Sequence, residues 1–211
     1  MKKIIARHKF FWKTREFRRA VFSGVIFLAI SLIVNHFANL YANMRAGKYV
    51  SDIILDNLPV MDVDDILNYG VEFFFLFVMY FLVIEPRRVS FVFKSLALFL
   101  LIRSAFIILT HLGPSPIITP INPNDLLSDL ITGNDFFFSG HTGAPFLIAL
   151  IFWEDKFIRY VSIAMSIIFG AAVLLGHLHY SIDVFAAFFI TYSIYHIAIK
   201  FFPKDYKLLE E

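Results

Sequence analysis

The sequence predicts an all-α integral membrane protein with six transmembrane helices and both termini in the cytoplasm. Three observations support this fold class. First, 59% of the 211 residues are hydrophobic and 17% are charged, whereas soluble domains are about 45–50% apolar and about 25% charged. Second, the apolar residues form continuous runs rather than the alternating pattern of a membrane β-barrel. Third, basic residues flank alternate ends of these runs, as the positive-inside rule requires.

Six apolar stretches are each close to the ~20 residues that a helix needs to cross the ~30 Å hydrocarbon core of a membrane. They are residues 20–42, 68–84, 89–112, 139–153, 157–176 and 180–202. The first is longer than the apolar core of a signal peptide, which has about 7–15 residues, so we interpret it as an uncleaved span. The second is marginal in length. The fourth is short, and we expect it either to include Phe136, Phe137 and Phe138 in its first turn or to end below one interface.

The distribution of charge predicts the orientation. Residues 1–19 contain eight Lys and Arg residues, whereas residues 113–138 contain none. Cytoplasmic loops carry the excess of basic residues, so we expect residues 43–66, 113–138 and 177–179 to face outside. We divide the chain into three parts. They are a basic cytoplasmic segment (1–19), a six-span membrane domain (20–202) and a cytoplasmic tail (203–211).

The composition also excludes several classes of protein. High hydrophobicity and a net charge of only +2 exclude disorder. The absence of cysteine excludes a disulfide framework, a cysteine nucleophile and a thiolate-bound zinc ion.

Polar side chains gather at the expected outer ends of two spans. Residues 139–142 are Ser-Gly-His-Thr, and residues 177–183 are His-Leu-His-Tyr-Ser-Ile-Asp. Because His179 and Asp183 are four residues apart, we expect them on one face of a helix. There the carboxylate can fix the tautomer of the imidazole. With His141 from another span, these residues fit nucleophilic catalysis with a separate general acid.

Each motif also has a purely structural interpretation. A histidine at a helix end is often a cap or an interfacial residue, and a His-x3-Asp pair is common on helices. Ser139 is a plausible N-cap residue, followed by a glycine that allows close approach. Function is favoured because the motifs occur together, on the side that the basic residues select independently.

These motifs resemble those of a known family. The segment Asp135-Phe-Phe-Phe-Ser139-Gly140-His141-Thr142, followed 38 residues after His141 by His179-Tyr-Ser-Ile-Asp183, resembles the sphingomyelin synthase-like branch of the type 2 phosphatidic acid phosphatase superfamily. The resemblance covers about residues 50–200. Its flanking features are Leu58-Pro59, Glu72, Arg103, His177 and Tyr195-His196.

The resemblance implies a role for each motif residue. His179 would attack phosphorus to form a phosphohistidine, Asp183 would orient it, and His141 would protonate the leaving group. We assign substrate binding to a further set of residues. They are Glu72, Arg103, Asp135, Ser139, Gly140, His177 and Tyr180. Two of these residues also have a structural interpretation. Glu72 could be a neutral acid hydrogen-bonded between helices, and Asp135 could be a helix cap.

The sequence departs from the phosphatase members at their basic residues. The motifs of those members resemble K-x6-R-P and S-R-x5-H. In this sequence Lys94 and Arg103 are nine residues apart, and Ser104 instead of proline follows Arg103. Ala172 and Val173 stand where the second Ser-Arg would be. Such residues clamp a phosphomonoester dianion through charge-assisted hydrogen bonds. Their absence favours a phosphodiester monoanion as the donor.

We therefore expect a lipid head-group phosphotransferase or phosphodiesterase. Its substrates would be a membrane phospholipid donor and, as acceptor, a lipid alcohol (diacylglycerol or ceramide) or water. We expect no cofactor, no metal and no nucleic-acid partner, because His and Arg side chains can stabilise the developing charge. The alternatives are a lipid phosphomonoester phosphatase and, more remotely, a non-enzymatic lipid-binding or transport protein. A homo-oligomer is left open. The expected location is a bacterial inner membrane or plasma membrane, with the site facing the periplasm or exterior.

Overall fold

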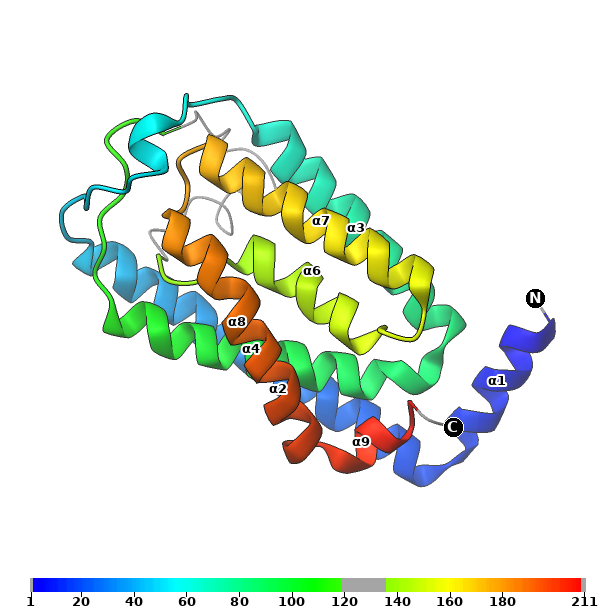
Figure 1. Ribbon diagram of the computed structural model, residues 1–211. Helices are drawn as coiled ribbons and strands as arrows, with labels where there is room; N and C mark the ends of the chain where they lie inside the picture. Colours follow the sequence, from blue (N-terminus) through cyan, green and yellow to red (C-terminus); the bar gives the residue numbers. More distant parts are fainter. Residues whose placement is uncertain (1, 119–135, 210–211) are drawn as a thin grey trace.

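The computed structural model describes residues 2–118 and 136–209. In this part of the chain the regular structure is helical (Figure 1). The α-helices are α1 (Lys2–Lys13), α2 (Arg15–Arg45), α3 (Asp64–Ile84), α4 (Val89–Leu109), α6 (Gly140–Ile151), α7 (Lys156–Leu175), α8 (Ser181–Phe201) and α9 (Pro203–Lys207). Two 3-10 helices, η1 (Leu55–Asn57) and η2 (Pro86–Arg88), lie in the connections.

Five helical segments of the described chain are long and apolar enough to cross a membrane, and they indicate an integral membrane protein. They are α2, α3, η2 with α4, α7 and α8. The predicted fourth span corresponds to α6, which has 12 residues and is therefore only ~18 Å long at 1.5 Å per residue. Five of the six predicted spans thus correspond to helices of spanning length, and α6 does not.

Helix α6 begins at Gly140 because the backbone before it leaves the helical region. Phe137 and Phe138 have φ angles of 122° and 32°, which side chains with a Cβ rarely adopt. Ser139 is the N-cap residue, and its hydroxyl oxygen accepts a hydrogen bond from the Thr142 N–H at 3.4 Å. Of the two alternatives for this short stretch, the one that places Phe136 to Phe138 in the first helical turn is therefore wrong. Instead, the fully buried Phe138 ring packs edge-on against Phe99.

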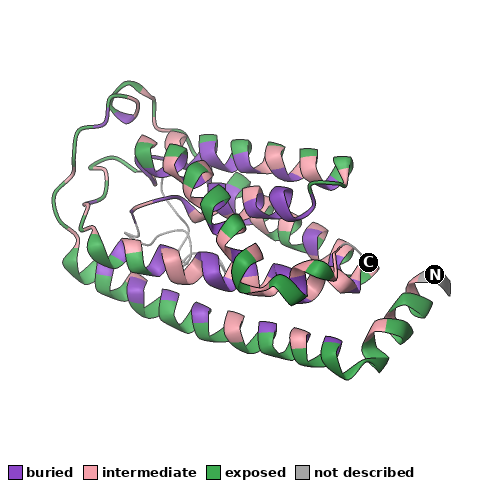
Figure 2. Cartoon of the chain, turned by 60° about the horizontal axis from the view of Figure 1, so that its bottom comes forward, coloured by how far each residue is buried: buried purple, intermediate pink, exposed green. Residues whose placement is uncertain are grey.

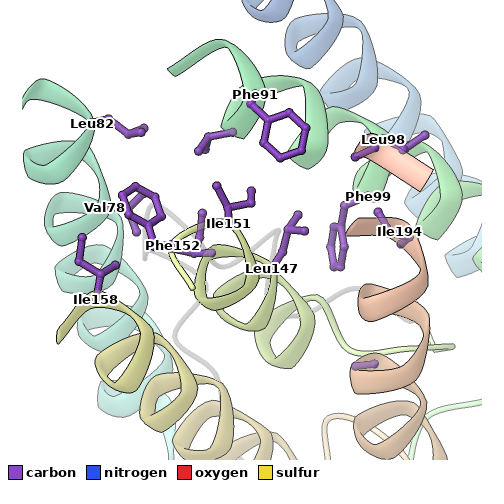
Figure 3. Close-up of a cluster of buried hydrophobic side chains, with 14 of the residues drawn as sticks. Val78, Leu82, Phe91, Leu98, Phe99, Leu147, Ile151, Phe152, Ile158 and Ile194 are labelled. Atoms are coloured by element: carbon purple, nitrogen blue, oxygen red, sulfur yellow. The ribbon is translucent and has the colours of Figure 1, made fainter. Parts of the chain in front are cut away.

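The core of the protein surrounds α6. This helix lies among α4, α7 and α8 (Figure 1). Its side chains Leu147 and Ile151 belong to one buried cluster (Figure 3). The cluster also includes Phe91 and Phe99 of α4 and Ile194 of α8. The close packing of these buried groups stabilises the bundle through many small dispersion contacts. A short helix can therefore be held in the centre of the molecule, with its N-terminus fixed at one end of the bundle.

The outward faces of α2 and α3 carry exposed apolar side chains, and Figure 2 shows the exposed face along α2. Their exposed side chains include Phe22, Ile30, Phe37, Phe73 and Leu76. Such faces are expected where a helix contacts lipid rather than water.

The basic N-terminal segment forms a helix of its own. Helix α1 ends at Lys13, and Thr14 separates it from α2. Arg7 forms an ion pair with Glu85, and His8 Nε2 lies 2.7 Å from the Val83 carbonyl oxygen. These contacts join α1 to the α3–α4 connection. The N-termini of α6 and α8 lie at the other end of the bundle (Figure 1).

Candidate active site

His179 and Asp183 form a buried pair at the start of α8. His179 lies two residues before the helix, and His179 Nδ1 is 3.2 Å from Asp183 Oδ2. Their side chains are 5% and 0% exposed. The Tyr180 N–H also donates to Asp183 Oδ2, at 3.0 Å. The expectation that both residues lie on a helix is therefore wrong for His179, which precedes the N-cap residue Tyr180 and still contacts Asp183 in the first turn of α8.

This arrangement fixes one tautomer of His179 when Asp183 is ionised. A carboxylate only accepts hydrogen bonds, so the proton must be on His179 Nδ1. Nε2 is then left with a lone pair for chemistry.

A main-chain hydrogen bond joins the two sequence motifs. The Ser139 N–H donates to the carbonyl oxygen of Asp183 at 2.9 Å. The Phe136 ring packs edge-on against the His179 ring, with centroids 6.1 Å apart. The turn that leads into His141 therefore lies directly against the start of α8, as the sequence analysis predicts.

Arg103 reaches this turn from α4. It is 5% exposed, and its Nε donates to the carbonyl oxygen of Phe138 at 3.3 Å. A Cβ on Gly140 would lie 3.3 Å from Arg103 Nε. Gly140 therefore allows the guanidinium to lie close to the turn that carries His141.

Asn35 of α2 is a site residue that the sequence analysis missed. Its Oδ1 accepts from Arg103 NH1 at 3.5 Å and from the Ser104 hydroxyl at 3.4 Å. It is 5% exposed. A polar side chain inside an apolar span is costly and marks a functional candidate, so this signal was present in the sequence.

A cavity of about 380 Å³ opens beside these residues. Its polar lining consists of Asn35, Asn39, Arg103 and His141, together with the backbone of Gly140. The remaining lining is apolar and includes Leu28, Leu32, Phe74, Leu96, Leu100 and Phe169. The cavity thus combines a cationic end with an apolar interior between α2, α3, α4, α6 and α7.

Residues 47–58 and Gly113 form hydrogen bonds with the start of α8. Asp52 Oδ2 accepts from the Ser181 N–H at 2.7 Å. The Tyr180 hydroxyl donates to the Gly113 carbonyl at 2.6 Å and accepts from the Val50 N–H at 3.1 Å. The sequence shows an acidic loop here but does not reveal which carboxylate caps α8.

Four groups in this region have shifted pKa values, and one of them is Asp56, whose pKa is lowered by hydrogen bonds from the Ser51 and Tyr49 hydroxyls. Burial alone would raise the pKa of Asp52, but the hydrogen bonds from Ser181, Leu55 and Ile54 outweigh it and lower the pKa. The hydrogen bond to the Asp56 carboxylate raises the pKa of Tyr49 to about 12. Burial raises the pKa of Tyr180. Asp52 is therefore a carboxylate near neutral pH, while both tyrosines keep their protons.

The other predicted residues lie in different places. His177 has a positive φ angle of 54°. Its Nε2 lies 3.2 Å from the Leu58 carbonyl oxygen, and its Nδ1 lies 3.5 Å from the Ser115 hydroxyl. The side chain therefore contacts two loops. Glu72 is exposed on α3 and is not among the residues lining the cavity. Asp135 lies outside the described residues.

Within residues 2–118 and 136–209, no three His, Asp or Glu side chains group together as a metal site. No curated protein and no solved structure matches the chain. Residues 132–200 match a family model described as PAP2 superfamily C-terminal, and this region contains α6, α7, α8 and both motifs. The match covers about a third of the chain, so this region, with both motifs, is similar to that superfamily's C-terminal part.

Proposed function

We propose that the protein transfers the phospho-head-group of a glycerophospholipid to a lipid alcohol or to water, through a phosphohistidine on His179. One observation carries the proposal. The cavity lined by Arg103, Gly140 and His141 begins at the turn whose Ser139 N–H donates to the Asp183 carbonyl oxygen. Through this turn it is linked to the buried His179–Asp183 pair, which does not itself line the cavity. The apolar interior of this cavity suits an acyl chain, and its cationic end suits a phosphate.

In the first step, His179 Nε2 attacks the phosphorus of the lipid. An N–P bond forms, and the bond between phosphorus and the diacylglycerol oxygen breaks. His141 donates a proton to that oxygen, so diacylglycerol leaves as a neutral alcohol. Arg103 stabilises the negative charge that develops on the phosphoryl oxygens.

In the second step, the hydroxyl of a lipid alcohol or water attacks the same phosphorus. His141, now neutral, takes the proton of that hydroxyl, and the N–P bond breaks to return His179 to its starting form. Two displacements at one phosphorus give ping-pong kinetics. The acceptor decides whether the enzyme is a transferase or a hydrolase.

The charge around the cavity favours a phosphodiester donor. Arg103 and His141 are the basic residues among those that line it. A phosphomonoester dianion needs more positive charge than a diester monoanion does. A phosphatidic acid phosphatase is the second candidate, supported by the superfamily match. A non-enzymatic lipid-binding protein is more remote, because it needs no buried His–Asp pair. We further propose that the site faces the exterior or periplasm, opposite the basic N-terminus.

A lipid panel tests the proposal. The purified protein in mixed micelles receives phosphatidylcholine, phosphatidylethanolamine, phosphatidylglycerol or phosphatidic acid, with and without ceramide or diacylglycerol. Products are identified by mass spectrometry. Diacylglycerol release or head-group transfer from a diester is expected, with none from His179→Ala and normal activity from His196→Ala, which alters an exposed histidine elsewhere on α8. Free phosphate from phosphatidic acid alone would contradict the diester proposal.

A further inference from the structure

A second cavity lies at the end of the bundle opposite the candidate active site. It has a volume of about 520 Å³ and occupies the angle between α1 and the start of α2. Its lining includes Trp12, Arg15, Arg18 and Arg19, followed along α2 by Phe22 and Val25. It shares no lining residue with the cavity beside His141.

The three arginines concentrate positive charge on one side of this cavity. All three are exposed, and none forms an ion pair or side-chain hydrogen bond with the residues that the structure describes. Other arginines at this end of the bundle are engaged. Arg7 and Arg87 pair with Glu85, and Arg88 donates to the Ile151 carbonyl. Arg15, Arg18 and Arg19 are therefore the guanidinium groups here that are open to an external anion.

The lining changes from cationic to apolar along α2. After the three arginines come Phe22 and Val25, which are 67% and 45% exposed. A free phosphate would use only the arginines. A phospholipid would place its phosphate on the arginines and an acyl chain along Phe22 and Val25. Trp12 belongs at such a boundary, since tryptophan is enriched where membrane and water meet.

Packing between aromatic side chains stabilises the angle between α1 and α2. Phe17 is 2% exposed, and its ring contacts those of Phe11 and Trp12 at centroid distances of 5.4 and 5.5 Å. The Arg7–Glu85 ion pair fastens the preceding helix to the α3–α4 connection. The cavity is therefore formed by the fold itself, before any ligand binds.

We propose that this cavity binds one anionic phospholipid, with its phosphate on Arg15, Arg18 and Arg19. Arginine matches phosphate oxygens through paired hydrogen bonds, and basic pockets beside membrane spans bind anionic head groups. The cationic choline of phosphatidylcholine would be repelled by the same three charges. The lipid is drawn from the leaflet opposite the candidate active site, so it is a resident partner rather than the substrate.

Photo-crosslinking tests this site. The full chain in micelles is labelled with phosphatidylglycerol or phosphatidylcholine carrying a photoreactive acyl chain, and labelled peptides are mapped by mass spectrometry. All proteins carry His179→Ala, so that turnover does not consume the probe. Labelling of residues 12–25 by phosphatidylglycerol is expected to exceed that by phosphatidylcholine about tenfold or more.

A charge-matched pair of variants completes the experiment. Arg15→Gln/Arg18→Gln/Arg19→Gln should lose this labelling, while Lys200→Gln/Lys204→Gln/Lys207→Gln should keep it. The control triple removes three exposed charges from α8 and α9 at the same end. Equal labelling by the two lipids, labelling that survives in the arginine triple, or equal loss in both triples would overturn the proposal. Displacement of the probe by millimolar glycerol 3-phosphate would assign the site to a free phosphate instead.

Discussion

The Ser139 N–H donates a hydrogen bond to the Asp183 carbonyl oxygen at 2.9 Å. Through it, the turn before His141 is fixed to the first turn of α8, whose Asp183 side chain holds His179. Ser139 and Asp183 are also a helix N-cap and a capping-box residue. Local capping and the assembly of the candidate active site therefore depend on the same residues.

Asp183→Asn should lower kcat by about 10²–10⁴-fold, because an amide can stabilise the wrong tautomer of His179 and cannot balance the charge on the imidazole. The matched control is Asp205→Asn, which changes a buried carboxylate paired with Lys94 at 2.7 Å, away from the site. This control should lower thermal stability and leave kcat within about twofold. Similar kcat losses in both variants would contradict a special role for Asp183.

Arg103→Lys should reduce kcat/KM for the lipid donor by about 10–100-fold, because lysine keeps the charge but loses the planar pair of donors. Arg88→Lys is the control, since Arg88 lies in η2 and donates to the Ile151 carbonyl. Steady-state kinetics with one diester lipid provide the measurement. An unchanged kcat/KM in Arg103→Lys would remove Arg103 from phosphate binding.

Asp52→Ala should lower kcat by about 3–30-fold with little effect on KM, because Asp52 holds the start of α8 without touching the cavity. Asp52→Asn should recover part of the activity, since its amide oxygen can accept from the Ser181 N–H while its NH2 group loses the hydrogen bonds from the Ile54 and Leu55 N–H groups. Asp65→Ala, at an exposed acid in the first turn of α3, serves as the control. If Asp52→Asn is no more active than Asp52→Ala, the hydrogen bond from the Ser181 N–H does not support activity.

Acid should release residues 47–58 from the start of α8. Because the pKa of Asp52 is lowered in the folded protein, its stabilisation is fully present above the unfolded pKa of about 3.9. It is lost as the pH falls through the lower folded value. Pepsin cleavage of this loop, normalised to denatured protein at each pH, should therefore rise below about pH 4 in wild type. A wild-type profile identical to that of Asp52→Asn would contradict this account.

Ala144→Leu should shift the preferred acyl chain of the donor to a shorter length, because Ala144 lines the cavity and a larger side chain reduces its volume. Ala29→Leu adds the same atoms to an exposed position of α2 that does not line the cavity. Competition among donor lipids of several chain lengths, measured by mass spectrometry, gives the preference. The same preference in both variants would show that the cavity does not hold the acyl chain.

Sequence reasoning predicted the helical membrane fold and the proximity of the two motifs. Hydrophobic runs and charge asymmetry are properties of the chain alone, so five long apolar helices could be expected. The start of α6 could not, because it depends on the positive φ angles of Phe137 and Phe138, next to the fully buried Phe138 ring. Apolar composition does not reveal such a break.

Hydrogen-bond partners that are far apart in the sequence could not be predicted either. Asn35 reaches Arg103 across 68 residues, and Asp52 reaches Ser181 across 129. Their partners are set by how α2 and the following loop fold over the site, and a single sequence contains no record of that. His179 was placed on a helix because four-residue spacing is typical of helices, but a residue just before the N-cap can also reach the first helical turn.

The most direct test of the central claim is to trap the intermediate on His179. The enzyme is mixed with a diester lipid, quenched at alkaline pH to preserve phosphohistidine, and digested for peptide mass spectrometry. The account predicts a phospho-head-group on His179 that is absent from His179→Ala and unchanged in His196→Ala. A head group attached to another residue, or full turnover by His179→Ala, would contradict it.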